Sequence, residues 1–426
     1  MYKIRRTQEG VELFDGFNYF ERVNFSMTTW YIIKAIKKHG KDGAVSKVIK
    51  LFDIDEKNAR EDIKTVLTNL NTLNIDMDKI PEKLTRTKYA PRTVHFDITP
   101  RCNSNCIYCI ASERMKHPEE LTTDQIINVV NQLPDMGTWL LTLSGGEPTL
   151  RKDFFQILDR VEKIKLLTQV FTNGTQITKE FANKFSKYKY AFAQVSIDSY
   201  KPEHHDFNRG VKGMHKRAVR GLKNLFDSGL TPEVCMVITR KNLYDIDKTA
   251  EFFYDMGVKY VRIGPAHPYS GKGFDNKEEL SLTSDQLKII GEKLISLNKK
   301  YAGEMEFYPT RHFVVYTVDP PKHKLHRCGN GRTVLYIKPN GFVYPCIFMV
   351  YPKFKIGDVK KDRIEDIWNN SNLLKRIRYF DKNKVEKCSK CEARDLCSGG
   401  CRSSSLYHHG SIFEYDPYFC ALFNVK

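Results

Sequence analysis

The sequence predicts an α/β protein with parallel strands in its central domain. From Thr93 to about Ile263, short β-prone runs alternate with helical patterns, which is typical of parallel strands joined by helical crossovers. Before this stretch short strands precede helices, and after it seven of the eleven cysteines are grouped. We therefore expect a module at 1–80, a linker at 81–92, an α/β domain at 93–300 and a cysteine-rich region at 301–426.

Composition and charge limit the class of protein. The 426 residues, 41% hydrophobic and 28% charged, suffice for two or three domains with their own cores. No apolar run approaches the ~20 residues of a membrane span, and Met1–Arg6 forms no apolar signal region, so we expect a cytoplasmic protein. The net charge of +18 favours an anionic partner, an acidic peptide or a nucleic acid, although a solvated lysine-rich surface explains it equally well. Without an RNA-binding aromatic motif or a zinc finger, nucleic acid is disfavoured.

The first 80 residues predict a small α+β unit. Its β-prone runs are Tyr2–Arg6, Val11–Phe14 and Tyr19–Asn24. Ser26 can cap a helix to about Lys38 that stops at His39-Gly40, and a second helix covers Ala44–Leu51. Asp55 caps the third helix, whose apolar residues at helical spacing are Ala59, Ile63, Val66, Leu67, Leu70 and Leu73. Strands followed by three helices predict a winged-helix-like unit. The linker after it, Lys83–Arg92, is a basic strap between prolines.

The α/β domain is expected to contain six strands and the helices between them. The predicted strands are Thr93–Thr99, Trp139–Ser144, Leu167–Thr172, Phe192–Ile197, Pro232–Ile238 and Tyr260–Ile263. A helix at Thr123–Leu133 carries Ile126, Ile127, Val130 and Leu133 on one face, and a later helix covers Ser284–Lys299. Active groups of parallel α/β sheets gather at the carboxyl ends of the strands.

Three cysteines follow the first of these strands. Cys102, Cys106 and Cys109 are spaced C-x3-C-x2-C, whereas structural zinc sites use four ligands, usually in two C-x2-C pairs. Three thiolates can hold three irons of a [4Fe–4S] cube and leave the fourth iron open. In a reducing cytosol, metal ligation is also favoured over disulfides.

This loop, with Tyr108 before its last cysteine, resembles the signature of radical S-adenosylmethionine (SAM) enzymes. The resemblance implies a partial (β/α)6 barrel, open on one side for a large substrate. It implies that the open iron chelates SAM and that one electron cleaves SAM to a 5′-deoxyadenosyl radical, which abstracts a hydrogen atom. Cys102, Cys106 and Cys109 are then the catalytic cluster ligands.

The resemblance extends to loops after the later strands. Gly145-Gly146-Glu147-Pro148 resembles the motif for the SAM amino group; glycine lets backbone approach closely, and Glu147 can accept from an ammonium group. Ser196 and Asp198 match positions that contact ribose hydroxyls, and Asn173 lies in a turn expected beside the nucleoside. Arg209, in Asn208-Arg209-Gly210, resembles an arginine that pairs with the SAM carboxylate. Each of these residues also has an ordinary loop role as its alternative.

The C-terminal cysteines resemble the seven-cysteine SPASM extension, which carries two auxiliary iron–sulfur clusters. The family pattern implies that Cys388, Cys391, Cys397 and Cys420 hold an outer [4Fe–4S] cluster and that Cys328, Cys346 and Cys401 hold an inner one. Relatives with a full ligand set have another cysteine shortly upstream of Cys328, but the segment Pro320–Arg327 of this sequence contains none. The inner cluster then has an open iron or uses His323, His326 or solvent. Cys235, inside an apolar strand, is expected to be a small buried hydrophobe.

The N-terminal unit resembles the recognition element of enzymes that mature ribosomally made peptides. The resemblance rests on Val11–Phe14, the Val23-Asn24 step and Asp62–Leu73, and implies an extended leader peptide added to the sheet edge. A stabilising cap or a DNA-binding winged helix are the alternatives.

Together these features predict a maturase that joins a peptide cysteine sulfur to a carbon as a thioether. An open auxiliary iron could bind the substrate thiolate and take up the surplus electron. The same parts could instead perform carbon–carbon crosslinking, oxidative decarboxylation, backbone excision or formylglycine formation on a sulfatase; an iron–sulfur redox sensor that binds DNA is the alternative outside enzymes. The expected partners are the precursor peptide and a reducing protein such as a flavodoxin or ferredoxin, with no membrane.

Overall fold

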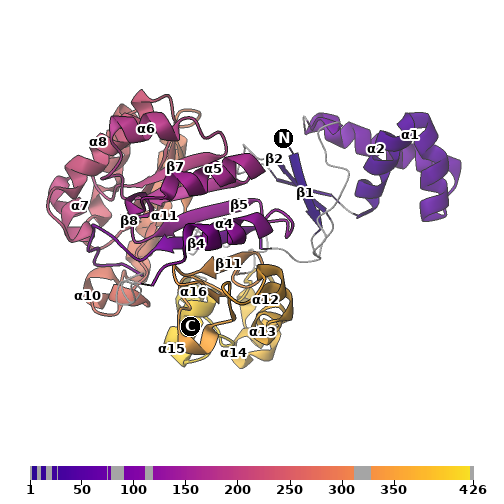
Figure 1. Cartoon of the computed structure of the whole chain (residues 1–426). Coiled ribbons are helices and arrows are strands. Elements are labelled where there is room, and N and C mark those ends of the chain that lie inside the picture. The colour runs from indigo at the N-terminus through magenta and orange to yellow at the C-terminus, as the bar shows by residue number, and fades with distance from the viewer. Residues whose placement is uncertain are drawn as a thin grey trace. The chain divides into compact units, whose positions relative to one another are not determined.

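The computed structural model describes residues 2–6, 11–15, 22–25, 27–73, 75–77, 91–110, 119–310 and 328–422. The chain forms two compact units (Figure 1). One comprises Met1–Arg92 with Leu133–Trp139, and the other comprises Thr93–Gln132 with Leu140–Lys426.

The first unit begins with an antiparallel sheet in the order β1-β2-β3. Its strands are β1 (Tyr2–Arg6), β2 (Val11–Asp15) and β3 (Arg22–Phe25). The first two strands lie where the β-prone runs predicted them. The third was expected from Tyr19, but residues 16–21 lie outside the described residues.

Two helices, α1 (Met27–Phe52) and α2 (Glu56–Thr72), follow this sheet. The stop expected at Gly40 is a kink with φ 69° that divides α1 into two helical segments. The Asp55 carboxylate accepts the backbone N–H of Asn58 at 2.8 Å, which confirms the predicted cap. The helices bury a common core made of Trp30, Ile33, Ile36, Val48, Ala59, Ile63, Val66 and Leu70. Leu73, expected in that core, is 51% exposed because α2 ends before it.

The second unit is built on a ten-stranded sheet in the order β10-β9-β8-β7-β6-β5-β4-β11-β12-β13. The six predicted strands are neighbours in chain order, and all of their pairings are parallel. They are β4 (Thr93–Thr99), β5 (Leu140–Gly145), β6 (Leu167–Thr172), β7 (Ala191–Ser196), β8 (Glu233–Ile238) and β9 (Tyr260–Pro265). The expected α/β architecture is therefore confirmed.

Helices connect these strands, and two more follow the last of them (Figure 1). They are α4 (Thr123–Gln132), α5 (Phe154–Ile164), α6 (Lys179–Phe185), α7 (Pro202–Arg209), α8 (Met214–Asp227), α9 (Ile246–Asp255), α10 (Lys277–Leu280) and α11 (Ser284–Lys300). The buried face of α4 contains Ile126, Val129 and Val130, whereas Ile127, expected on it, is only half-buried. The α11 helix begins with a capping box between Thr283 and Gln286.

Both edges of the sheet carry strands that the sequence did not predict. At one edge β10 (Glu306–Pro309) pairs in parallel with β9. At the other, β11 (Val334–Ile337) pairs in parallel with β4, and β12 (Phe342–Tyr344) and β13 (Gly357–Asp358) extend it antiparallel. The start of the cysteine-rich region is thereby hydrogen-bonded beside the strand that leads to Cys102.

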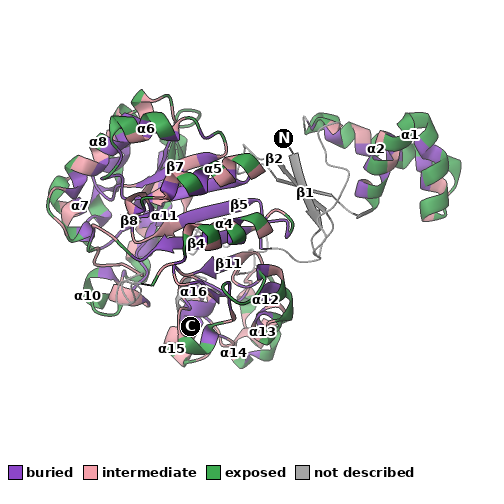
Figure 2. Ribbon diagram, in the orientation of Figure 1, coloured by how far each residue is buried: buried purple, intermediate pink, exposed green. Residues whose placement is uncertain are grey.

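The rest of the cysteine-rich region is made of short helices. These are α12 (Ile364–Asn370), α13 (Asn372–Arg378), α14 (Glu386–Ser389), α15 (Arg402–His409) and α16 (Pro417–Leu422). In the residues that the structure describes, 3-10 turns are η2 (Pro148–Leu150), η3 (Leu243–Asp245), η4 (Gly271–Gly273), η5 (Pro352–Phe354), η6 (Lys382–Lys384) and η7 (Glu392–Asp395). Buried residues concentrate in the parallel strands and are sparse in α14 (Figure 2). No helix in the described part of the chain is long and apolar enough to cross a membrane.

Candidate active site

The three-cysteine loop leaves the carboxyl end of β4 and is held by backbone hydrogen bonds from two other segments. The N–H groups of Asn105 and Ile107 donate to the carbonyls of Arg209 and Asn208, at 2.9 and 3.0 Å. On the other side, the Lys272 N–H donates to the Cys109 carbonyl at 3.0 Å. The fold therefore sets the course of this loop through its backbone.

The two glycines after β5 lie against the start of the same loop. The N–H groups of Gly146 and Glu147 donate to the carbonyls of Thr99 and Arg101. A Cβ on Gly145 would lie 2.3 Å from the Thr99 carbonyl oxygen, and one on Gly146 would lie 2.1 Å from that of Arg101. The close approach that glycine permits here is to the cysteine loop itself.

The Glu147 carboxylate is buried and bonded within the protein. It accepts from the hydroxyls of Thr149 and Thr172, at 2.6 and 2.7 Å, and from the Asn173 N–H at 2.7 Å. Burial raises the pKa of Glu147, and these hydrogen bonds oppose the rise. This carboxylate fixes the turn after β5 to the end of β6.

Asn173 extends that connection to the cysteine loop. Its amide donates to Asn103 Oδ1 at 2.7 Å and to Ser104 Oγ at 3.1 Å, and its Oδ1 accepts from Thr175. The Asn103 amide in turn donates to the Thr175 hydroxyl at 2.8 Å. The turn expected beside a nucleoside thus also positions the residues next to Cys102.

Asp198 and Arg209, expected to contact SAM, lie against each other. Arg209 Nη2 donates to Asp198 Oδ1 at 2.8 Å, and the Tyr108 hydroxyl donates to Oδ2 at 2.6 Å. Burial raises the pKa of Tyr108 well above its usual value, and the Arg209 cation opposes this. Ser196, the last residue of β7, is half-buried and makes no side-chain hydrogen bond to the described residues.

The thiols show a feature suited to cluster ligation. In three places a cysteine sulfur accepts a hydrogen bond from the backbone N–H two residues later. The Ser104 N–H donates to Cys102 at 3.4 Å, the Phe348 N–H to Cys346 at 3.3 Å and the Gly399 N–H to Cys397 at 3.3 Å. Hydrogen bonds to ligand sulfurs tune iron–sulfur clusters. Burial raises the pKa of Cys102 to about 11, so the free thiol stays protonated, whereas metal coordination would deprotonate it.

The C-terminal thiols fall into two electrostatic groups. Burial raises the pKa of Cys346 well above its usual value, and the charges of Cys401 and Cys328 raise it further. Burial raises the pKa of Cys420 to about 11, and Cys388 and Cys397 add to that rise. Cys388 in turn interacts with Cys397 and Cys391. We call Cys328, Cys346 and Cys401 the inner group and Cys388, Cys391, Cys397 and Cys420 the outer group, and their division into two sets of cluster ligands stays a prediction.

These thiols do not converge as the ligands of one ion would. Within the described ranges, no three His, Cys, Asp or Glu side chains are arranged to hold a single metal ion. Each cysteine of a cubane binds a different iron, so its thiolates stand apart. The donor set, the hydrogen bonds to sulfur and the grouping therefore fit clusters. His323 and His326 lie outside the described residues.

The segment after β9 joins the cysteine loop to the inner thiol group, which the sequence analysis missed. Besides its bond to Cys109, this segment places the His267 ring parallel to that of Phe348, with centroids 3.9 Å apart. Tyr269 stacks on Tyr407 of α15 at 4.2 Å. The sequence signal for this contact was the pair of glycines in Ser270-Gly271-Lys272-Gly273. Gly271 is needed there because a Cβ on it would lie 2.3 Å from the Cys109 carbonyl oxygen.

A second buried polar network was also missed. Glu233 accepts from the amides of Gln169 and Gln194 and, at 2.8 Å, from Arg262 Nη2. These side chains come from β6, β7, β8 and β9 and share one face of the sheet. Cys235, also on β8, is half-buried, and burial raises its pKa to about 12.

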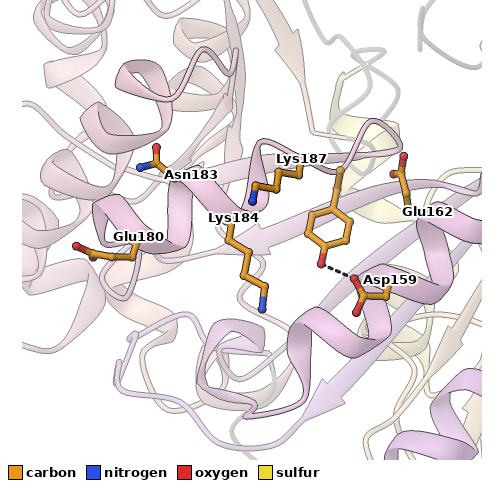
Figure 3. Close-up of a pocket in the computed structure, with 7 residues that line it drawn as sticks. Asp159, Glu162, Glu180, Asn183, Lys184 and Lys187 are labelled. Carbon is orange, nitrogen blue, oxygen red and sulfur yellow. Dashed lines mark hydrogen bonds between the residues drawn. The ribbon is translucent and has the colours of Figure 1, made fainter.

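One groove in the described residues is not part of this site. It has a volume of about 560 Å³ and lies on α5, α6 and the turn after α6 (Figure 3). Its lining residues are Asp159, Glu162, Glu180, Asn183, Lys184, Lys187 and Tyr188. None of the predicted ligand or SAM-contact residues lines it.

An α/β sheet with a three-cysteine loop at its carboxyl edge and two further thiol groups has the features of an iron–sulfur protein. The pattern of the Radical SAM superfamily matches residues 96–253, and that of the SPASM iron-sulfur cluster-binding domain matches residues 328–392. The mycofactocin maturase MftC of Mycolicibacterium smegmatis is 30% identical over 343 residues, 80% of this chain and 85% of that protein. This chain therefore belongs to the radical SAM superfamily and carries a SPASM domain.

Two further comparisons extend the similarity. The PqqA peptide cyclase of Rhizobium meliloti is 28% identical over 77% of this chain and 86% of that protein. Among solved structures, Streptococcus suis SuiB bound to the precursor peptide SuiA superposes with a TM-score of 0.75 at 18% identity. That superposition covers 97% of each chain, so the similarity of fold includes the N-terminal unit.

Proposed function

We propose that this protein is a peptide maturase that cleaves SAM reductively and forms a sulfur-to-carbon thioether in a ribosomally made precursor. The observation that carries the proposal is the backbone-held loop of Cys102, Cys106 and Cys109 at the carboxyl end of the sheet, joined by the segment after β9 to an inner group of three thiols.

The proposed roles follow from the positions of the side chains. Cys102, Cys106 and Cys109 hold a [4Fe–4S] cluster by three irons, and the four outer and three inner cysteines hold two auxiliary clusters. When bound and reduced, the first cluster supplies one electron to SAM and so generates the 5′-deoxyadenosyl radical. Gly145, Gly146, Glu147 and Pro148 form the turn that shapes the SAM site, which the backbone bonds of Gly146 to Thr99 and of Glu147 to Arg101 hold in place, and Asn173 orders the neighbouring turn. The Ser196 hydroxyl, with no partner in the described residues, is available to a ribose hydroxyl.

A peptide substrate is supported by the relatives and by the N-terminal unit. One relative is named a peptide cyclase, and SuiB, of similar fold over 97% of this chain, was crystallised with a precursor peptide. We assign the N-terminal unit to leader recognition, with the peptide added as a further strand to the β1-β2-β3 sheet. Backbone hydrogen bonds would give affinity for the leader peptide there, and side-chain pockets would give sequence specificity.

The thioether is supported by the inner thiol group. It contains three cysteines in the described part of the chain, one fewer than the irons of a cube, which leaves a position for a substrate thiol. Bond formation then removes one hydrogen atom from carbon, which ends on 5′-deoxyadenosine, and one proton from the thiol. The remaining electron passes to the auxiliary cluster, so atoms and electrons balance.

The test uses anaerobically reconstituted enzyme with SAM, dithionite and the precursor encoded beside its gene. We expect 5′-deoxyadenosine, and a peptide product lighter by two hydrogens whose cysteine resists alkylation. The matched control is a precursor with that cysteine changed to alanine, which should gain no crosslink. A product that loses two hydrogens but keeps a free thiol would mean carbon–carbon crosslinking, and loss of a larger fragment would mean decarboxylation or excision. Failure to form any 5′-deoxyadenosine would overturn the enzyme class.

A further inference from the structure

A buried ion pair touches the three-cysteine loop. Asp198 is fully buried and Arg209 is 7% exposed. Asp198 Oδ1 accepts from Arg209 Nη2 at 2.8 Å and from the Val237 N–H at 3.1 Å, while Oδ2 accepts from Tyr108 at 2.6 Å. Both carboxylate oxygens are thus engaged within the protein, and Asp198 holds the guanidinium in one orientation.

The free end of that guanidinium faces a cluster ligand. Arg209 Nη1 lies 3.9 Å from Cys106 Sγ, and the guanidinium carbon lies 5.3 Å from the centre of the Tyr108 ring. Arg209 Nε is buried and has no hydrogen-bond partner in the described residues. The backbone of Arg209 also bonds to Asn105, inside the loop. Side chain and backbone together fix a positive charge beside the sulfur of Cys106.

A fixed charge at this place acts on redox chemistry. The reduced form of a cluster carries one more negative charge than the oxidised form, so a neighbouring cation stabilises the reduced form more. Away from water this interaction is stronger than at the surface, because the effective dielectric constant is lower there. The Asp198 carboxylate carries the opposite charge and lies on the other side of the guanidinium. It therefore offsets part of the effect of the Arg209 charge on the cluster.

We propose that Arg209, oriented by Asp198, is a positioning residue that raises the reduction potential of the cluster on Cys102, Cys106 and Cys109. The proposal rests on the proposed function only in requiring a cluster at these cysteines. It gives Asp198 and Arg209 a task that exists before SAM binds, whereas the sequence resemblance assigns them to SAM itself. The two assignments differ in what they predict for the enzyme without SAM.

The experiment is a potentiometric titration of reconstituted enzyme without SAM, followed by electron paramagnetic resonance. Spectra of the Cys102→Ala/Cys106→Ala/Cys109→Ala variant supply the auxiliary signals to subtract. In Arg209→Gln the ratio of reduced to oxidised cluster at a fixed potential should fall about tenfold, which is about 59 mV for one electron. In Asp198→Asn the potential should shift in the opposite direction.

Three further variants separate charge from structure. Arg209→Lys keeps the charge and should restore most of the potential, and the double variant Arg209→Gln/Asp198→Asn should return towards the wild type. Tyr108→Phe removes a hydrogen bond without changing charge, so it should shift the potential least. If Arg209→Gln assembles no cluster, Asp198→Asn still decides the sign of the charge effect.

The outcomes distinguish this inference from the proposed function. Unchanged potentials with full iron in all variants would overturn the inference. So would unchanged potentials with weaker SAM binding in Arg209→Gln, because Arg209 would then be a SAM ligand. A wild-type enzyme without iron at the three cysteines would instead overturn the proposed function.

Discussion

The three-cysteine loop and the outer thiol group are built in different ways. The loop is bonded through its backbone to α7, to the turn after β5 and to the segment after β9. Three of the four outer cysteines, Cys388, Cys391 and Cys397, lie on or beside α14 and η7, short elements that contribute no buried residue, and the fourth, Cys420, lies on α16. There the backbone bonds are local turns, and charged side chains connect more distant segments: Lys382 donates to the carbonyls of Arg394 and Cys397, and Arg402 donates to those of Ile412 and Glu414.

This difference implies that the two regions depend on iron to different degrees. A loop fixed by the sheet can keep its course without a cluster. Short helices without buried residues have little apolar burial to stabilise them, so a ligated cluster supplies the missing stabilisation, as in other small metal-bound modules. We therefore expect the outer group to unfold locally on loss of metal, and the loop to remain.

The largest effect should come from replacing Cys102, Cys106 and Cys109 together with alanine. Because the open iron is lost, 5′-deoxyadenosine formation should fall below detection by mass spectrometry. The auxiliary clusters should remain, leaving about eight of about twelve iron atoms per chain. Loss of all iron would contradict the separate construction of the two regions.

Removing iron from the whole protein with a chelator should separate the regions directly. Amide hydrogen exchange should rise strongly in Glu386–Cys401, while the amides of Asn105 and Ile107, bonded to α7, keep most of their protection. The holoprotein, measured in parallel, is the reference. Equal loss of protection in both regions would mean that the loop also depends on its cluster.

A smaller but specific effect is expected from Gly146→Ala. The new Cβ would lie 2.1 Å from the Arg101 carbonyl oxygen, so the turn and the cysteine loop must separate. SAM cleavage should fall more than about tenfold, with a loss of about 1–3 kcal/mol in the free energy of unfolding. Gly303→Ala is the matched control: its φ of 79° costs about 1–2 kcal/mol, but nothing lies within 4 Å of the new Cβ. Equal rates in the two variants would contradict the close-approach argument.

The smallest effect is expected from the ion pair of Arg151 and Asp153, which contacts the strand β4 that leads to the cysteine loop. Hydrogen bonds from Arg151 lower the pKa of Asp153 to about 2, and Arg151 also donates to the Ile98 carbonyl on β4 at 2.7 Å. Because the folded-state pKa is lowered, the stabilisation is present above pH ~4 and is lost as the pH falls towards 2. In urea titrations of the iron-free chain, Asp153→Asn should be less stable at pH 7 and should lack this acid dependence. An unchanged pH profile would show that the ion pair contributes no stability.

The sequence predicted the regular parts of the fold well. The strands Thr93–Thr99 and Leu167–Thr172 have the predicted bounds, and α11 is one residue longer than expected. The edge strands β10 to β13 were missed because they have two to four residues, too few to show a periodicity. Their pairing depends on distant residues, such as the hydrogen bond from Tyr336 to Asp97.

The candidate site divides in the same way. By itself the sequence determined the number, type and spacing of the cysteines, because ligand chemistry depends on residue type and local spacing. The tertiary structure decided which groups bond to the buried carboxylates: Glu147 accepts hydrogen bonds from Thr149, Thr172 and Asn173, and Asp198 accepts from Arg209 and Tyr108. A buried charge must find its partner wherever the fold brings one, and no local pattern in the chain records that partner.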